Sequence, residues 1–277
     1  MVANFSTQRF RETLRITFCM RRAAILLLFI FVAASAHAQS RRRAASSGDD
    51  LFGATARILW IGAHPDDESL IAPLLGTACA ERGAQCSLLV LTRGEHGPCA
   101  LPEGCADLGA IRAAEMSAAA NLLHASLTLW SHADVMENVR DTWPASIVDD
   151  VAAEVARFAP TVVITFDPRH GSSCHPAHRA AAELTIEALA RFDDPPPLLF
   201  VETVNRDLSL ENATPGAPGL RTHDGAWHYL LDDLAAHRSQ FTDEQRATIA
   251  ATPHERQRVW LLDARWAPFA TYVYGCP

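Results

Sequence analysis

RILWIGAHPDDE, residues 57–68, begins with a short apolar run that lacks helical spacing and continues as a polar turn. The mostly apolar segment 70–82 follows this turn and ends at Gly83. This order predicts a buried strand, a loop and a helix with glycine at its C-cap. A second apolar run, CSLLVLT at residues 86–92, predicts the next buried strand.

The same alternation continues along the chain. Further helices are expected at 110–124, at 146–158 and from the histidine-rich loop 167–178 to about Phe192, and further strands at 127–130, 161–166 and 198–203. Strands that alternate with helices predict an α/β fold, a Rossmann-like three-layer sandwich with a mainly parallel sheet. No GxGxxG motif follows the first strand, which argues against a dinucleotide cofactor.

The first 38 residues have the pattern of a cleaved export signal. Residues 23–34 form an apolar run that is too short to span a bilayer, and Arg21 and Arg22 precede it. Residues 36–38, Ala-His-Ala, supply a cleavage site, so the mature chain is expected to begin near Gln39. Met20 would serve as the start codon of a compact signal. We therefore expect an exported protein, periplasmic or extracellular, with no stable membrane anchor after cleavage; an uncleaved anchor is the alternative.

The charge of the remaining chain excludes one class of partner. Removal of residues 1–38 takes away five arginines and one glutamate, a loss of four net positive charges, and changes the formal charge from −8 to −12. A chain this acidic is not expected to bind nucleic acid. Residues 39–54 are expected to form a flexible tether, and residues 55–277 to form one domain with a single core.

Of the seven cysteines, Cys19 leaves with the signal, which leaves an even number, six, in the exported chain. Disulfides are expected in an oxidising compartment. Cys99 with Cys105, which bracket a short Pro/Gly loop, is the first candidate pair. Cys79 with Cys86 is a second, and spacing does not decide whether Cys174 pairs with Cys276.

Potential metal ligands gather in the two segments 64–68 and 170–178, each of which directly follows a predicted strand. Ligands of parallel sheets bind at the carboxyl ends of the strands, where both segments should lie. His175 and His178 are three apart at the start of a helix and therefore share one face of it. Two imidazoles and one carboxylate would leave zinc an open coordination position, as in catalytic rather than structural sites.

The AHPDDE motif at residues 63–68 closely resembles the signature of the PIG-L/LmbE-like deacetylases, zinc enzymes that remove acetyl groups from N-acetylglucosamine-type substrates. The similarity extends to TRGE at residues 92–95, to Arg112 and Glu115, and to HRSQ at residues 237–240. The resemblance implies zinc ligands His64, Asp67 and His178, a general base Asp66, and an electrostatic or acid partner His175.

One residue departs from the family pattern. Ala177 stands where the family's HPDH motif has an aspartate, which would hold and charge the neighbouring imidazole of His175. Asp167, in the same loop, is the candidate to replace that aspartate.

The residue types fit amide hydrolysis independently of the family name. Zinc can polarise an amide carbonyl and ionise a water molecule, Asp66 can take the proton of that water, and a protonated His175 can stabilise the oxyanion. This chemistry predicts a zinc-dependent amide hydrolase. The resemblance implies, more narrowly, a deacetylase for a small-molecule or glycan substrate of the N-acetylglucosamine type. Arg112 and Asp134 are candidate substrate contacts; the alternative is that they are ordinary helix-surface or loop charges.

Other functions remain open at this point. A catalytically silent, zinc-containing carbohydrate-binding protein would account for Ala177, but it has no use for an unligated base such as Asp66. An amidase acting on a non-sugar N-acyl substrate would use the same site. A zinc protease is disfavoured because no HExxH motif is present.

Overall fold

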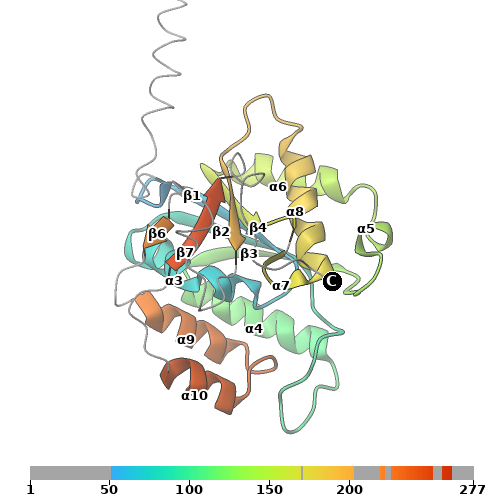
Figure 1. The fold of residues 1–277 in the computed structure, drawn as a ribbon, viewed down its shortest axis with the longest axis vertical. Helices are drawn as coiled ribbons and strands as arrows, with labels where there is room; N and C mark the ends of the chain where they lie inside the picture. The colour runs from blue at the N-terminus through green and yellow to red at the C-terminus, as the bar shows by residue number, and fades with distance from the viewer. Residues whose placement is uncertain (1–50, 170, 203–218, 222–225, 252–257, 264–277) are drawn as a thin grey trace, which may run out of the picture. The chain divides into compact units, whose positions relative to one another are not determined.

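The computed structural model describes residues 51–169, 171–202, 219–221, 226–251 and 258–263. Seven strands form one sheet in the order β3-β2-β1-β4-β5-β7-β6 (Figure 1). The strands are β1 (Arg57–Gly62), β2 (Gln85–Thr92), β3 (Ala125–His132), β4 (Val162–Phe166), β5 (Leu198–Glu202), β6 (Gly219–Arg221) and β7 (Arg258–Asp263).

Five of these strands, from β3 to β5 across the sheet, are parallel, which confirms the predicted fold class and all five predicted strands. The last two strands differ, since β7 pairs antiparallel with both β5 and β6. The chain leaves β1 toward β2 and β3 and later returns to place β4 on the other side of β1. The loops after β1 and β4 therefore diverge at the switch point of the sheet, where ligands of such folds bind.

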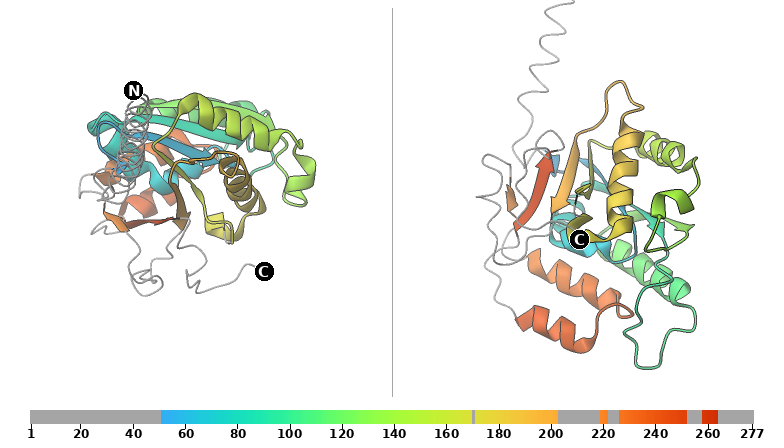
Figure 2. Two further views of the ribbon diagram at one scale, coloured as in Figure 1. Left: turned by 90° about the horizontal axis from the view of Figure 1, so that it is seen from above. Right: turned by 45° about the vertical axis from the view of Figure 1, so that its right-hand side comes forward.

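The helices cover both faces of the sheet. The β1–β2–β3 connections run one way along the sheet and the β3–β4–β5 connections the other way, so right-handed crossovers place their helices on opposite faces. Figure 2 shows α9 and α10 beside α4 and far from α6 and α8. The helical elements are η1 (Asp67–Ile71), α3 (Ala72–Leu75), η2 (Gly76–Glu81), α4 (Leu108–Leu122), α5 (Val139–Thr142), α6 (Ile147–Phe158), α7 (Gly171–Cys174), α8 (Pro176–Leu189), α9 (Trp227–Ala236) and α10 (Asp243–Ala251).

The sequence explains where these elements begin and end. The strand β1 is apolar on both faces because it lies in the middle of the sheet, and its Trp60 side chain is fully buried against Phe166. Helix α6 buries apolar residues at helical spacing and ends at Ala159, whose backbone is left-handed directly before Pro160. The predicted helix at 70–82 is a composite of η1, α3 and η2.

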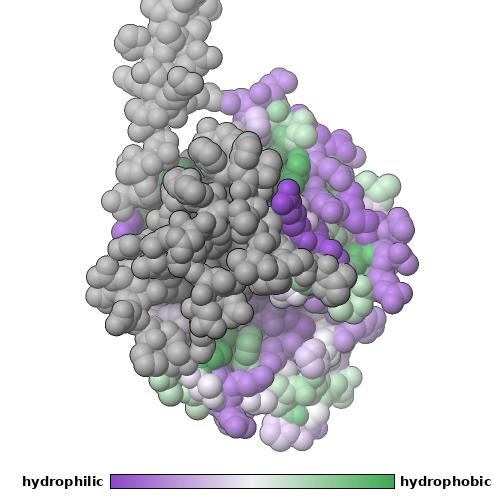
Figure 3. Space-filling model, in the orientation of Figure 1, coloured by the Kyte–Doolittle hydropathy of each residue, from purple (hydrophilic) through white to green (hydrophobic). Residues whose placement is uncertain are grey.

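The surface shows few large apolar side chains. Among the described residues, Met136 and Ile186 are the exposed large hydrophobics, at 60% and 38% exposure. Over α6 and α8 the described surface is mostly hydrophilic (Figure 3). None of the described helices is long and apolar enough to cross a membrane.

Four of the cysteines form two close pairs, Cys79 with Cys86 and Cys99 with Cys105, with a Cα–Cα distance of 5.9 Å in each. Both pairs were candidates from the sequence. The export signal, most of the tether, His170 and Cys276 lie outside the described residues, so the structure does not test the predictions made for them.

Candidate metal and active site

The switch point brings together the three side chains predicted to bind metal. His64 follows β1, Asp67 begins η1, and His178 lies in the first turn of α8, after β4. His64 Nδ1 lies 3.3 Å from His178 Nε2 and 3.8 Å from an oxygen of Asp67, and His178 Nε2 lies 3.0 Å from the other oxygen. All three residues are buried, with at most 9% exposure.

Each imidazole is oriented by a contact at the nitrogen that faces away from the other ligands, so that the lone pairs of the remaining nitrogens face one another. His178 Nδ1 lies 2.8 Å from the Gly171 carbonyl, which can accept its proton and leave Nε2 as an acceptor. His64 Nε2 lies 3.2 Å from Asp134 Oδ1, which likewise leaves Nδ1 as an acceptor. Two imidazole nitrogens and a carboxylate that converge in this way fit a divalent metal ion.

The pKa shifts of His64 and Asp67 fit the predicted binding of a cation. Burial lowers the pKa of His64, but hydrogen bonds and charges from Asp134 and Asp67 outweigh it and raise the pKa to about 9. Burial raises the pKa of Asp67, but the two histidines outweigh it and bring the pKa well below its usual range. The acidic surroundings that hold a proton on the imidazole also favour a metal cation in its place.

Asp134 therefore orients His64, one of the predicted metal ligands, a role that the sequence did not suggest. Its carboxylate also accepts a hydrogen bond from the backbone N–H of His96 at 3.0 Å, and its own N–H donates to Glu95 at 3.3 Å. Asp134 is 6% exposed and lines the cleft, so the prediction that it contacts substrate stays open.

We expect Asp134→Asn to weaken metal binding by about 10–100-fold, because an amide holds the His64 imidazole less firmly than a carboxylate does. The measurement is a competition titration with a chelator of known affinity. The exposed aspartate of α9, changed in the control Asp232→Asn, should leave the affinity unchanged. Equal affinities in all three proteins would remove Asp134 from this role.

Asp66 lies beside the metal ligands but is oriented toward Arg112. Its Oδ1 lies 3.1 Å from Arg112 Nη2, and its side chain is 21% exposed. Burial raises the pKa of Asp66 to about 7, although the Arg112 guanidinium lowers it. The carboxylate is thus a partly accessible base that shares the cleft with the ligands.

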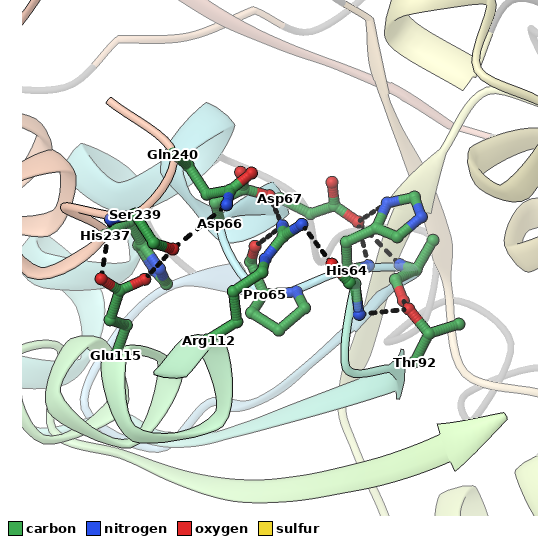
Figure 4. A network of polar contacts seen from close by, with 12 residues as sticks. His64, Pro65, Asp66, Asp67, Thr92, Arg112, Glu115, His237, Ser239 and Gln240 are labelled. Carbon is green, nitrogen blue, oxygen red and sulfur yellow. Dashed lines mark hydrogen bonds and ion pairs between the residues drawn. The ribbon is translucent and has the colours of Figure 1, made fainter. Parts of the chain in front are cut away.

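Arg112 is not a helix-surface charge, so that alternative is wrong. The residue is 4% exposed, and its guanidinium donates to the carbonyls of Pro65 and Gly94 (Figure 4). Gly94 has a φ of 62°, and a Cβ there would lie 2.4 Å from Arg112 Nη1. Only glycine therefore lets the TRGE turn approach the guanidinium.

The first residue of that turn also contacts the loop that carries His64. Thr92 Oγ1 donates to the Ala63 carbonyl at 2.9 Å and accepts from the Gly94 N–H at 3.1 Å. The TRGE similarity thus corresponds to a turn that contacts the loop after β1 directly at Ala63 and, through Arg112, at Pro65.

His175 lies next to the ligands, with its ring centroid 4.7 Å from those of His64 and His178. Its Nδ1 accepts a hydrogen bond from the backbone N–H of Ala177 at 3.2 Å, as the N-cap of α8. A neutral imidazole that accepts at Nδ1 carries its proton on Nε2. Burial, followed by the charges of His64 and His178, lowers the pKa of His175 to about 4. The Nε2 proton is available for donation, and the predicted role as an electrostatic or acid partner stays a prediction.

The loop before α8 shows what Asp167 does. This fully buried carboxylate accepts hydrogen bonds from the backbone N–H groups of Arg169 at 2.9 Å and Ser172 at 3.4 Å. It shapes the loop that presents Gly171 to His178. His175 instead accepts its hydrogen bond from the backbone N–H of Ala177, the residue that stands where the family motif has aspartate.

A cleft of about 410 Å³ opens above the ligands. It is lined by His64, Asp66, Asp67, His96, Gly97, Pro98, Arg112, Asp134, Met136, His175, His178 and Gln240. All seven residues predicted for the site line this cleft.

The segment 237–240 contributes a wall of the cleft that the sequence indicated only through its similarity to the family. Ser239 donates through its backbone N–H and its hydroxyl to the Glu115 carboxylate, at 2.8 and 2.6 Å. Gln240 lines the cleft and donates to the Pro98 carbonyl at 3.0 Å. The HRSQ segment thus joins α4 and the 97–107 loop at the site (Figure 4); its similarity to the family was the signal that could have shown this.

The fold and the site define a Rossmann-like α/β protein whose side chains at the sheet's switch point fit a divalent metal ion. The family model described as PIG-L, GlcNAc-PI de-N-acetylase, matches residues 59–189. A 1D-myo-inositol 2-acetamido-2-deoxy-alpha-D-glucopyranoside deacetylase from Mycolicibacterium vanbaalenii is 31% identical over 234 residues, which cover 76% of this chain and 80% of the relative. The chain belongs to the PIG-L family.

Two further comparisons set the limits of this similarity. The deacetylase of the same name from Actinosynnema mirum is 33% identical over 159 residues, which cover 50% of this chain. The chain spans about half the length of such relatives, 56% in this case. In fold, the chain is similar to N,N'-diacetylchitobiose deacetylase from Pyrococcus horikoshii, with a TM-score of 0.60 at 18% identity over 79% of this chain and 88% of that one.

Proposed function

We propose that this protein is a zinc-dependent deacetylase that hydrolyses the N-acetyl group of an N-acetylglucosamine-type sugar or glycan. The observation that carries the proposal is the convergence of His64, Asp67 and His178 beside a partly exposed Asp66 that is not one of the converging ligands. A silent metal site needs the first three residues only. A hydrolytic site also needs the base.

The proposed chemistry assigns a separate task to each side chain. Zinc, when held by the three ligands, would supply a Lewis acid for the amide carbonyl and lower the pKa of water. Asp66 takes a proton from the attacking water and returns it to the leaving amine, so that water and amide give acetate and amine. His175 donates a hydrogen bond from Nε2 to the developing oxyanion. Arg112 orients the base and neutralises part of its charge.

The substrate class is supported by the cleft and by the relatives. The cleft is open to solvent, and its lining includes side chains that can bind hydroxyl groups, among them His96, Arg112 and Gln240. The two sequence relatives described above are named as deacetylases of an acetamido-glucopyranoside. These names support an acetamido sugar over a peptide as the substrate.

The proposal is tested with purified, metal-loaded protein and a panel of N-acetylated amino sugars, their oligosaccharides and non-sugar N-acetyl amines. Acetate and free amine should appear in equal amounts, and the sugars should react faster. Faster release from the non-sugar amines would favour the amidase alternative. Bound metal and bound sugar without any release would favour the carbohydrate-binding alternative.

We further propose that the chain is exported as one catalytic domain, residues 55–277, behind a cleaved signal and a tether. Cys99, which is exposed, and the buried pair Cys79 and Cys86 would then be oxidised. Protein recovered outside the cytoplasm should begin near Gln39, and its four paired cysteines should resist alkylation until a reductant is added. N-terminal sequencing and mass spectrometry check this; a chain with residues 1–38 intact and free thiols would contradict it.

A further inference from the structure

A second group of ionisable side chains lies behind the cleft, fully buried. Glu68, Asp233 and His237 form this buried acid–imidazole cluster, in which the nearest ligand-type atoms all lie within 4.8 Å of one another. Glu68 follows the metal ligand Asp67 in η1, whereas Asp233 and His237 come from the end of α9, about 165 residues later in the chain. The mechanism proposed above does not use any of the three.

Two successive hydrogen bonds lead from His237 through Glu68 to the base. His237 Nε2 lies 2.6 Å from Glu68 Oε1, and Glu68 Oε2 accepts the backbone N–H of Asp66 at 3.2 Å. Both oxygens of Glu68 therefore act as acceptors, which a carboxylate can do and a glutamine amide cannot. The imidazole holds one oxygen of Glu68, and the other oxygen holds the base.

The backbone of Asp66 needs such a constraint. Its φ of 106° lies in the left-handed region, which residues other than glycine rarely adopt. Asp66 is the N-cap of η1, but its side chain makes no capping hydrogen bond. A strained conformation of this kind persists where surrounding contacts fix it, and the Glu68 carboxylate is the contact at this backbone N–H.

The third member of the cluster, Asp233, is a buried acid without a hydrogen bond. Among the described residues, neither Asp233 oxygen nor His237 Nδ1 has a hydrogen-bond partner. Burial and the charge of Glu68 raise the pKa of Asp233 well above its usual range, which favours the neutral acid. Burial lowers the pKa of His237, but the neighbouring carboxyl groups, Glu68 first, outweigh it and raise the pKa to about 9. An imidazolium makes a strong, short hydrogen bond to the Glu68 carboxylate.

We propose that His237, acting through Glu68, is a positioning residue that holds Asp66 in its strained, catalytically competent conformation. This inference rests on the proposed function, since it concerns the same base. In this role the end of helix α9 contributes to catalysis, although the family model matches only residues 59–189.

The test uses two isosteric substitutions of His237 in the full-length protein. Glutamine places an amide N–H near the position of Nε2, whereas asparagine places it near Nδ1, too far from Glu68 to donate. We expect His237→Asn to lower kcat by about 10–100-fold with unchanged KM and metal content, and His237→Gln to recover most of that loss. His228→Asn, at an exposed histidine of the same helix, is the matched control.

Each outcome decides for or against the proposal. Wild-type kcat in His237→Asn would overturn it, as would equal losses in the two variants, because the donated hydrogen bond would then not matter. A second metal ion in the wild type that His237→Asn loses would assign the cluster to a metal site instead. If His237→Asn does not fold, Glu68→Gln must show the same loss of kcat. Absence of turnover in the wild type would count against the proposed function rather than against the positioning role.

Discussion

Asp66→Ala should retain its metal ion and lose nearly all turnover. The three ligands and their outer contacts do not include the Asp66 side chain, so the metal content should stay at the wild-type level. Loss of the general base is expected to lower kcat by about 10²–10⁴-fold. The measurements are metal content by mass spectrometry and acetate release on the same sample.

Asp66→Asn separates the loss of the base from the loss of the contact with Arg112. An asparagine oxygen can still accept from the guanidinium, which lies 3.1 Å from Asp66 Oδ1, but it cannot take a proton from water. Both variants should therefore be inactive, while Asp232→Asn at the exposed aspartate stays active. A variant of Asp66 with an undiminished rate would remove this residue from the role of base.

His178→Ala should lose both the metal and the activity. Its Nε2 lies closest to the other two ligands, and the Gly171 carbonyl and the stacked Phe166 ring fix its orientation. Without this imidazole two ligands remain, and the lone pairs no longer converge. We expect at least a 10³-fold loss of kcat at low metal concentration, by analogy with the loss of an essential catalytic group.

The pattern of metal loss distinguishes His178 from Asp66. High metal concentrations should partly restore turnover in His178→Ala but not in Asp66→Ala. His228→Ala, at the exposed histidine of α9, should match the wild type in both measurements. Full metal content in His178→Ala would contradict the proposed ligand set.

The sequence predicted the fold and the site well where local patterns control the structure. Short apolar runs predicted the five parallel strands because a central parallel strand is buried on both faces. The segments 64–68 and 171–178 meet at the switch point because the strands before them are neighbours. The two antiparallel strands β6 and β7 were not predicted, since their pairing depends on contacts between distant segments.

The supporting contacts could not be predicted from local patterns. Asp134 and Arg112 each look like surface charges in sequence, yet both are buried against site residues. His175 was expected to need a carboxylate in place of Ala177, whereas the N–H of Ala177 itself meets Nδ1. The Glu68–His237 contact joins residues 169 apart, and no spacing rule connects them.

The most direct test of the account is a stepwise zinc titration of the metal-free protein, with acetate release from an N-acetylated amino sugar measured after each addition. We predict no release without metal and a linear rise that levels off at one zinc ion per chain. The plateau should be absent in Asp66→Ala, although that variant takes up the same single ion. Full activity in the metal-free protein, or no release at any zinc content from any acetamido sugar, would contradict the account.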